Sequence, residues 1–208
     1  GFKKHQELID VAALPDAAGR VAQYEAMAEA LEAHGFGRIG LDHFALPHDP
    51  MAKAAADGTL RRNFQGYTTD QTTTLIGLGA SSISSLKQGY AQNHVELPPW
   101  RDAIAKGRLP THKGIALSES DRIQREIIDA LMCRGEVDLG FIAQSHGIAV
   151  STCAPDPERF DLVERLGIAK RDGDRIQVDP DARPLLRVVA AAFDRYLSPE
   201  ATRHSAAV

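Results

Sequence analysis

Apolar residues recur at helical spacing in the first part of the chain, which predicts a long amphipathic helix there. The helix is expected to begin after Leu14-Pro15-Asp16 and to end at His34-Gly35, where glycine can take the left-handed conformation typical of a helix end. Its apolar stripe consists of Val21, Tyr24, Met27, Ala28 and Leu31. Two shorter helices are predicted over 51–57 and 95–106, each followed by a glycine.

A short apolar run over 38–45 stops at Pro47, which is typical of a strand. A helix that leads into such a strand is half of a βαβ unit, and ligands gather at the carboxyl ends of strands in barrels and open sheets, so Asp42 and His43 are candidate site residues. Adjacent strand residues point to opposite faces, which favours a structural role for His43. A second strand is predicted over 68–78, where β-branched residues are frequent.

The pattern changes after residue 110. The segment 109–114 has the composition of a hinge, which divides the chain into units 1–110 and 111–208. Ser118 and Asp121 resemble a helix-capping pair before a helical stripe of isoleucine, leucine and methionine. Further helices are predicted over 141–146, 157–166 and 183–197, and a β-hairpin turns at Asp172-Gly173-Asp174. Three helices, a hairpin and a last helix form a winged-helix-like order.

Composition and charge exclude several classes of protein. The chain has 208 residues, of which 43% are hydrophobic and 25% charged, as is ordinary for a soluble globular protein. A net charge of −4 argues against a nucleic-acid or anionic-membrane partner. No apolar run has the ~18 residues of a membrane span, and the first residues lack the apolar core of a signal peptide, so a cytoplasmic location is expected. Cys133 and Cys153 have no partners at metal-ligand spacing and are expected to be buried apolar residues.

The segment 62–93 concentrates the candidate chemistry. Gly77-Leu78-Gly79-Ala80-Ser81-Ser82 could hold an anion with backbone N–H groups, or its glycines could simply permit close packing. Aromatic and amide side chains of the same segment could stack on a ring and read its polar edge, or pack locally; these are Phe64, Gln65, Tyr67, Tyr90, Gln92 and Asn93. The residues alone predict a two-unit protein with a small-molecule loop, no metal ligands and no catalytic residue.

Four ordered blocks resemble the oxygen-independent coproporphyrinogen III oxidase family. They are 39–47, 60–69, 77–84 and 89–93, and the similarity extends over nearly the whole chain, which corresponds to roughly the C-terminal half of such an enzyme. The resemblance implies a radical S-adenosylmethionine enzyme of porphyrin and haem biosynthesis that decarboxylates two propionates of coproporphyrinogen III to vinyl groups, giving protoporphyrinogen IX. Its [4Fe-4S] cluster needs a Cys-x3-Cys-x2-Cys motif, which this sequence lacks.

The resemblance also implies a helix-rich α+β fold and a set of cofactor contacts. Residues 1–47 would supply the last helix and strand of a partial (β/α) barrel, 48–110 a cofactor-facing cover, and 111–208 the small winged-helix-like domain. Ile83 corresponds to an isoleucine that contacts S-adenosylmethionine, and Phe64 and Gln65 lie in a cofactor-facing segment. The motifs further mark Asp42, Tyr67 and Asn93 as facing cofactor or substrate.

The implied partners are coproporphyrinogen III and the enzyme's own N-terminal radical half. Without that half, the chain is expected to be inactive, and the strand 39–45 would expose an edge that favours self-association. Two other functions remain open: a winged-helix module that binds DNA or protein, and a stand-alone anion- or nucleotide-binding protein. The mixed charges of 157–166 make that helix a poor phosphate-binding face.

Overall fold

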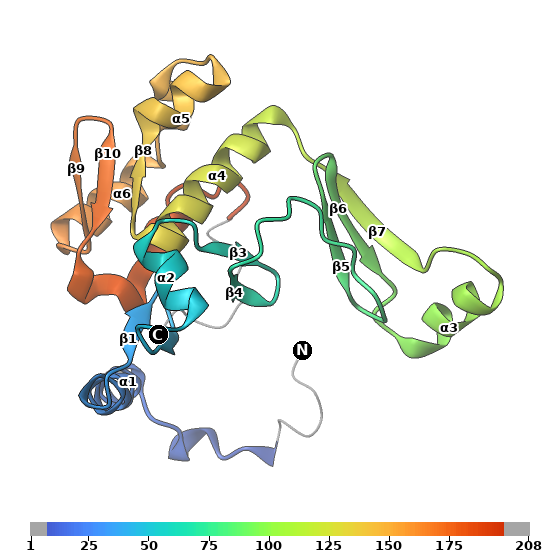
Figure 1. The fold of residues 1–208 in the computed structure, drawn as a ribbon, viewed down its shortest axis with the longest axis horizontal. Helices are drawn as coiled ribbons and strands as arrows, with labels where there is room; N and C mark the ends of the chain where they lie inside the picture. Colours follow the sequence, from blue (N-terminus) through green and yellow to red (C-terminus); the bar gives the residue numbers. More distant parts are fainter. Residues whose placement is uncertain (1–7, 198–208) are drawn as a thin grey trace.

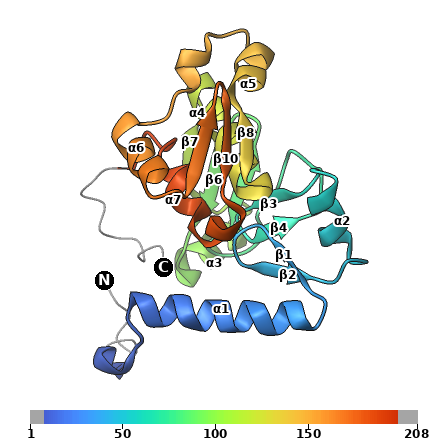
Figure 2. The ribbon, with the colours of Figure 1, turned by 90° about the vertical axis from the view of Figure 1, so that its left-hand side faces the viewer.

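A computed structural model describes residues 8–197 of the chain (Figure 1). Helix α1 (Ala17–Ala33) confirms the first predicted helix: the Asp16 side chain accepts a hydrogen bond from the Gly19 N–H, and the helix ends at His34. Figure 2 shows α1 lying below the rest of the chain. Ala28 is buried and Tyr24 contacts Leu41 and Phe44 of the following hairpin, whereas Val21 and Met27 are 46% and 47% exposed, so only part of the predicted apolar stripe is covered by the described chain.

Residues 37–45 form an antiparallel hairpin, and the prediction of a single strand over 38–45 is wrong. Strands β1 (Gly37–Ile39) and β2 (His43–Ala45) pair with each other. The chain turns at Gly40, whose φ of +58° lies in the left-handed region, and a Cβ there would lie 2.1 Å from the Tyr67 ring. A glycine inside an apolar run is the sequence signal of this turn. Helix α1 still leads into a strand, β1, but this strand pairs with β2 in an antiparallel hairpin.

A second hairpin follows the short helix α2 (Pro50–Ala56), which confirms the helix predicted there. Strands β3 (Arg61–Asn63) and β4 (Gly66–Thr68) pair antiparallel around Phe64 and Gln65. The strand predicted over 68–78 is wrong beyond Thr68. Its polar side chains bond to nearby backbone instead: Thr68 Oγ1 accepts from the Asp70 N–H, and Asp70 Oδ1 from the Thr72 N–H.

A three-stranded antiparallel sheet projects from the body of the molecule and carries α3 (Leu97–Ala105) at its far end (Figure 1). Its order is β5 (Ile83–Leu86), β6 (Gly89–Asn93) and β7 (Thr111–Ala116). Strand β7 occupies most of the segment 109–114, which was predicted to be a hinge. The sheet also takes strands from both sides of the predicted boundary between 110 and 111.

The C-terminal part follows the predicted order with one added strand. Helix α4 (Glu119–Arg134) begins with a complete capping box between Ser118 and Asp121. Strand β8 (Glu136–Asp138), which the sequence pattern did not indicate, precedes α5 (Leu139–His146) and α6 (Pro157–Arg165). The predicted hairpin is β9 (Ala169–Asp172) with β10 (Arg175–Val178), and β10 pairs with β8 on its other edge. The last helix, α7 (Leu186–Ala191), is shorter than predicted because a 3-10 segment, Pro180–Leu185, with Pro184 inside it, occupies the start.

One hydrophobic core joins α4 to the β8–β10–β9 sheet, to the β1–β2 and β3–β4 hairpins and to α7. Its most completely buried large side chains are Leu60, Ile127, Leu131, Leu139, Ile176 and Leu186. Cys133 and Cys153 are free, buried thiols, as predicted from the sequence. In the described part of the chain, no helix combines the length and the apolar character that crossing a membrane requires.

Candidate functional site

A cleft opens where the β3–β4 hairpin, one face of the β5–β6–β7 sheet and α4 meet. It has two connected halves, here called the aromatic half, about 460 Å³, and the basic half, about 560 Å³. The two halves share six lining residues, which are Arg62, Asn63, Ser85, Leu117, Arg125 and Asp129. We call the whole the central cleft.

The tight turn of the β3–β4 hairpin positions Phe64 at the aromatic half. Asn63 Oδ1 accepts a hydrogen bond of 2.8 Å from the Gln65 N–H, an arrangement that bends the chain locally. Phe64 then meets Tyr90 edge to face, with ring centroids 5.3 Å apart and planes inclined by 78°. Phe64 is still 53% exposed, and Gln65 beside it is exposed. The cleft therefore offers an aromatic edge with open surface beside it.

The strand register places several side chains of the sheet on the face that lines the cleft. Ser85 lies opposite Tyr90 in the β5–β6 pair, and Tyr90 lies opposite Ile115 in the β6–β7 pair. Ile83, two residues before Ser85, shares this face because side chains alternate along a strand. Ile83 is half-buried and is not among the residues that line the cleft. Ile83 therefore lies next to the cleft, on the same face of the sheet as Ser85.

Two arginines stand at the junction of the halves. The guanidinium carbon of Arg62 lies 5.7 Å from the centre of the Tyr67 ring, and that of Arg125 lies 5.4 Å from the centre of the Tyr90 ring. Arg125 also donates to Ser85 Oγ at 3.3 Å. Each guanidinium is thus held against an aromatic side chain.

Asp129 is the carboxylate that both halves share. Burial raises its pKa, while Arg61, whose Nη1 lies 3.7 Å from Asp129 Oδ2, acts in the opposite direction. Burial at this position thus disfavours the charged form of Asp129.

The side chain of Asn93 holds the loop 77–82 in place with three hydrogen bonds. The Asn93 amide donates to the carbonyl oxygens of Gly77 and Gly79 and to Ser82 Oγ, at 3.3, 3.0 and 3.1 Å. A Cβ at Gly77 would approach the Ile83 backbone to 2.9 Å, so this glycine permits close packing. The Gly77 N–H is bonded to Ser84 Oγ. Asn93 shapes the loop and is buried.

Tyr67 and Asp42 have partners within the protein. The buried Tyr67 hydroxyl bonds to the Leu41 N–H and the Met132 carbonyl, and burial raises its pKa. Asp42 Oδ1 lies 2.8 Å from His43 Nδ1, because Asp42 sits in the hairpin turn and not on a strand as expected. The His43 ring meets Tyr67 edge to face at 5.0 Å. Tyr67 therefore joins the β3–β4 hairpin to the β1–β2 hairpin, and the Asp42–His43 pair lies at the turn of the latter.

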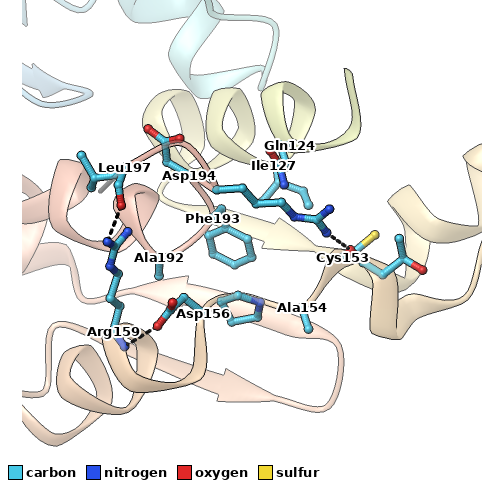
Figure 3. Close-up of a pocket in the computed structure, with 13 residues that line it drawn as sticks. Gln124, Ile127, Cys153, Ala154, Asp156, Arg159, Ala192, Phe193, Asp194 and Leu197 are labelled. Carbon is cyan, nitrogen blue, oxygen red and sulfur yellow. Dashed lines mark hydrogen bonds between the residues drawn. The ribbon is translucent and has the colours of Figure 1, made fainter. Parts of the chain in front are cut away.

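A second pocket, about 400 Å³, lies between α6, α4 and the residues after α7 (Figure 3). Its polar groups are used internally: Figure 3 shows Arg159 donating to the Leu197 carbonyl and Asp156 Oδ1 accepting from the Arg159 N–H. Arg159 also donates to the Ala191 carbonyl. Arg195 is bonded to Ser120 Oγ and to the Thr152 carbonyl. These bonds hold the end of the described chain in place, and the central cleft remains the better candidate site.

No group of three or more His, Cys, Asp or Glu side chains in residues 8–197 could hold a metal ion. Burial raises the pKa of the Cys133 thiol to about 12 and also raises that of Cys153, so both favour the protonated form. Cluster iron requires several thiolates. The residues described here therefore do not fit a [4Fe-4S] cluster.

Sequence reasoning located Phe64 but missed Arg125, Ser85 and Ile115 as cleft residues. Ser85 and Ile115 come from strands whose pairing could not be read from the pattern. The signal that was available is on α4, where Arg122, Arg125 and Asp129 recur at helical spacing along one polar face. From the sequence alone, such a stripe indicates a solvent-exposed helix face. Only the structure shows that the β5–β6–β7 sheet lies opposite it.

Similar curated proteins and a similar solved structure all carry the name of one enzyme. No family model matches the chain. An oxygen-independent coproporphyrinogen III oxidase from Bradyrhizobium diazoefficiens is 47% identical over 207 residues, covering 100% of this chain and 46% of the relative. One from Paracoccus denitrificans is 40% identical over 210 residues, covering 99% and 45%. The chain spans about half the length of the curated relatives it matches.

A solved structure gives the same result for the fold. Coproporphyrinogen III oxidase from Escherichia coli, described as a radical SAM enzyme, superposes with a TM-score of 0.86 at 35% identity, over 92% of this chain and 44% of that one. The fold of mixed helices and strands is thus shared, and neither alternative function considered from the sequence is favoured. Over nearly its whole length, the chain matches the C-terminal part of oxygen-independent coproporphyrinogen III oxidases.

Proposed function

We propose that this chain forms the C-terminal part of an oxygen-independent coproporphyrinogen III oxidase and supplies one wall of its active site. The observation that carries the proposal is the 47% identity over 207 residues to the Bradyrhizobium enzyme, which extends through the central cleft. The enzyme would decarboxylate two propionates of coproporphyrinogen III to vinyl groups. Its radical chemistry would be supplied by S-adenosylmethionine and a [4Fe-4S] cluster bound by the N-terminal part.

The parts of the chain would have different roles in that enzyme. Helix α1 and the β1–β2 hairpin would close the partial barrel, and the β3–β4 hairpin with the β5–β6–β7 sheet would cover the cofactors. Ile83, Phe64 and Gln65 would face S-adenosylmethionine. The exposure of Phe64 and Gln65, and the common face of Ile83 and Ser85, support this assignment. Asn93 would act by shaping the loop, and Tyr67 and Asp42 by supporting the hairpin.

Residues 111–208 would form the winged-helix-like domain. The order of α4, β8, α5, α6, β9 and β10 supports this proposal, since a helix and strand precede two helices and a hairpin. The β7 strand at its start pairs with β6, so the domain would be tied to the cover. We place the enzyme in the cytoplasm.

The exposed side of α1 would face the N-terminal half. Val21 and Met27 are about half exposed, and such residues favour a protein contact over solvent. Without that half, the same surface and the short β1–β2 hairpin would favour self-association of the chain. Sedimentation over a wide concentration range tests this, and a strictly monomeric chain would contradict it.

Complementation tests the proposed function. The N-terminal part of the Bradyrhizobium enzyme is fused to this chain, reconstituted without oxygen, and assayed for protoporphyrinogen IX formed from coproporphyrinogen III. We expect activity comparable to the intact Bradyrhizobium enzyme. A fusion that binds its cluster normally yet makes no product would overturn the proposal.

The chain alone provides the matched negative control. Under the same reconstitution we expect neither product nor bound cluster, because the two cysteines are buried and protonated. Stoichiometric iron and sulfide on the isolated chain would contradict this expectation.

A further inference from the structure

The two halves of the central cleft differ in chemistry. The aromatic half has an apolar part made of Phe64, Tyr90, Ile115, Ile128 and Met132, and its lining also includes Asp121, Gln124, Asp194 and Tyr196. The basic half carries five cationic side chains, which are Arg61, Arg62, Lys87, Arg122 and Arg125, against three acidic ones, Asp70, Glu126 and Asp129. An occupant of the whole cleft would therefore have an apolar body and an anionic arm.

The acidic residues of the basic half are turned to other partners. Glu126 Oε2 lies 2.9 Å from His146 Nε2, on α5, and Asp129 Oδ2 lies 3.7 Å from Arg61 Nη1. Asp70 Oδ1 accepts from the Thr72 N–H. Among the described residues, none of the three forms an ion pair with Arg62 or Arg125, although Asp129 is near enough for Arg125 to act on its pKa.

Arg62 and Arg125 have unused hydrogen-bonding capacity. Within residues 8–197, neither forms an ion pair, and the buried Arg62 Nε has no hydrogen-bond partner. A buried N–H without a hydrogen-bond partner lowers the stability of the folded protein. A ligand that accepts a hydrogen bond from it would remove this cost. Arg125 has one contact, to Ser85 Oγ, and four further N–H donors available. Stacking on Tyr67 and Tyr90 holds both guanidinium groups in position before any ligand arrives.

We propose that Arg62 and Arg125 bind a carboxylate arm of a ring-shaped tetrapyrrole whose apolar body lies against Phe64, Tyr90 and Ile115. The planar guanidinium group suits a carboxylate because it can donate two parallel N–H bonds. This inference rests on the function proposed above and deepens it, since propionate arms are the anionic groups of coproporphyrinogen III. Arg62 and Arg125 are positioning residues for substrate and take no part in bond breaking.

Coproporphyrin III, the stable oxidised form of the substrate, serves as a fluorescent probe with the isolated chain. Titration of the wild type is compared with Arg125→Gln, a change on an exposed side chain that leaves the core intact. We expect affinity to fall about tenfold on loss of this charge-assisted bond. Arg125→Lys keeps the positive charge but loses the two parallel N–H donors of the guanidinium group. It should therefore restore part of the lost affinity. Arg62→Gln should give a loss of similar size.

Arg108→Gln is the matched control. Arg108 follows α3, far along the sheet, and pairs only with Asp102 among the described residues, so its loss should leave the affinity unchanged. Asp129→Asn removes the carboxylate that competes for these arginines and should tighten binding several-fold. Far-UV circular dichroism of each variant verifies its fold.

The outcomes separate this inference from the proposed function. Equal affinity of wild type, Arg125→Gln and Arg62→Gln would overturn the carboxylate anchor while leaving porphyrin binding intact. Absence of binding to the wild-type chain would also overturn it as a preformed site. In both cases the fusion assay described above tests the proposed function separately, because it measures the formation of protoporphyrinogen IX and not the affinity of the isolated chain for a porphyrin.

Discussion

The hydroxyl of Tyr67 donates a hydrogen bond of 2.8 Å to the carbonyl oxygen of Met132, which joins the β3–β4 hairpin to the end of α4. The same hydroxyl accepts from the Leu41 N–H at 2.9 Å, in the turn of the β1–β2 hairpin. One buried oxygen therefore ties three elements together, directly behind the cleft.

Substitution of Tyr67 by Phe should lower the free energy of unfolding by about 2 kcal/mol, because a buried N–H and a buried C=O both lose their partner. Urea denaturation measures the change. Tyr24→Phe is the matched control: its hydroxyl makes one long contact, 3.4 Å to the Leu41 carbonyl, and its removal should cost less than about 1 kcal/mol. Equal losses in the two variants would show that the Tyr67 bridge is not special.

Asn93→Ala should loosen the loop 77–82 without unfolding the protein. It removes one side chain that satisfies two carbonyl groups and a hydroxyl. Hydrogen exchange at the Ser81 amide, which donates to the His94 carbonyl, should become about tenfold faster. Gln92→Ala, which loses a single bond to the Ser81 carbonyl, should change exchange less. Unchanged exchange in Asn93→Ala would contradict the bracing role.

Asp121 should contribute pH-dependent stability. Hydrogen bonds from Tyr196 and Ser118 lower its pKa, so the folded state binds the proton less tightly than the unfolded state. Its contribution is therefore present above the unfolded pKa of about 4 and is lost as the pH falls through the lower folded pKa.

The measurement compares urea midpoints of wild type and Asp121→Asn near neutral pH and well below about pH 4. We expect the wild type to be more stable at neutral pH and the difference to shrink in acid. Tyr196→Phe, which removes the first of these hydrogen bonds, should lose part of the same effect. A difference that does not depend on pH would mean that the carboxylate charge contributes nothing.

Both cysteines should resist thiol reagents in the folded chain. Cys133 and Cys153 are 5% and 2% exposed, and burial raises the pKa of the Cys133 thiol to about 12. Reaction with an aromatic disulfide reagent at mildly alkaline pH should be at least about 100-fold slower than in denaturant, where both thiols titrate at once. A thiol that reacts rapidly in the native chain would contradict the burial.

The sequence pattern predicted local elements well where one periodicity and one cap acted together. Helix α4 is the best example, since Ser118, Asp121 and the buried Ile123 and Ile127 all indicate the same start and face. The pattern failed over 38–45 and 68–78. In the first, the turn at Gly40 is stabilised by Tyr67 from a distant segment, and in the second, short-range bonds of Thr68 and Asp70 outweigh strand propensity.

The candidate site was predictable only in part. Phe64 could be found because its surroundings form a recognisable block, whereas the contribution of Arg125 depends on α4 facing β5 and β6. That arrangement follows from long-range packing, which no local pattern records. The proposed function came from the family resemblance, whereas the pairing of an aromatic and a basic half is visible only in the fold.

The sheet that bears α3 has a mechanical consequence for the cleft. Strand β7 continues into α4 through Leu117 alone before the Ser118 cap, and the sheet extends outward from this junction (Figure 1). Tyr90 belongs to the sheet and Arg125 to α4, and the guanidinium carbon of Arg125 lies 5.4 Å from the centre of the Tyr90 ring. Because β7 and α4 meet at Leu117, any rotation of the sheet about this junction would change the width of the cleft, and α3 lies at the end of the sheet where such a rotation would be largest.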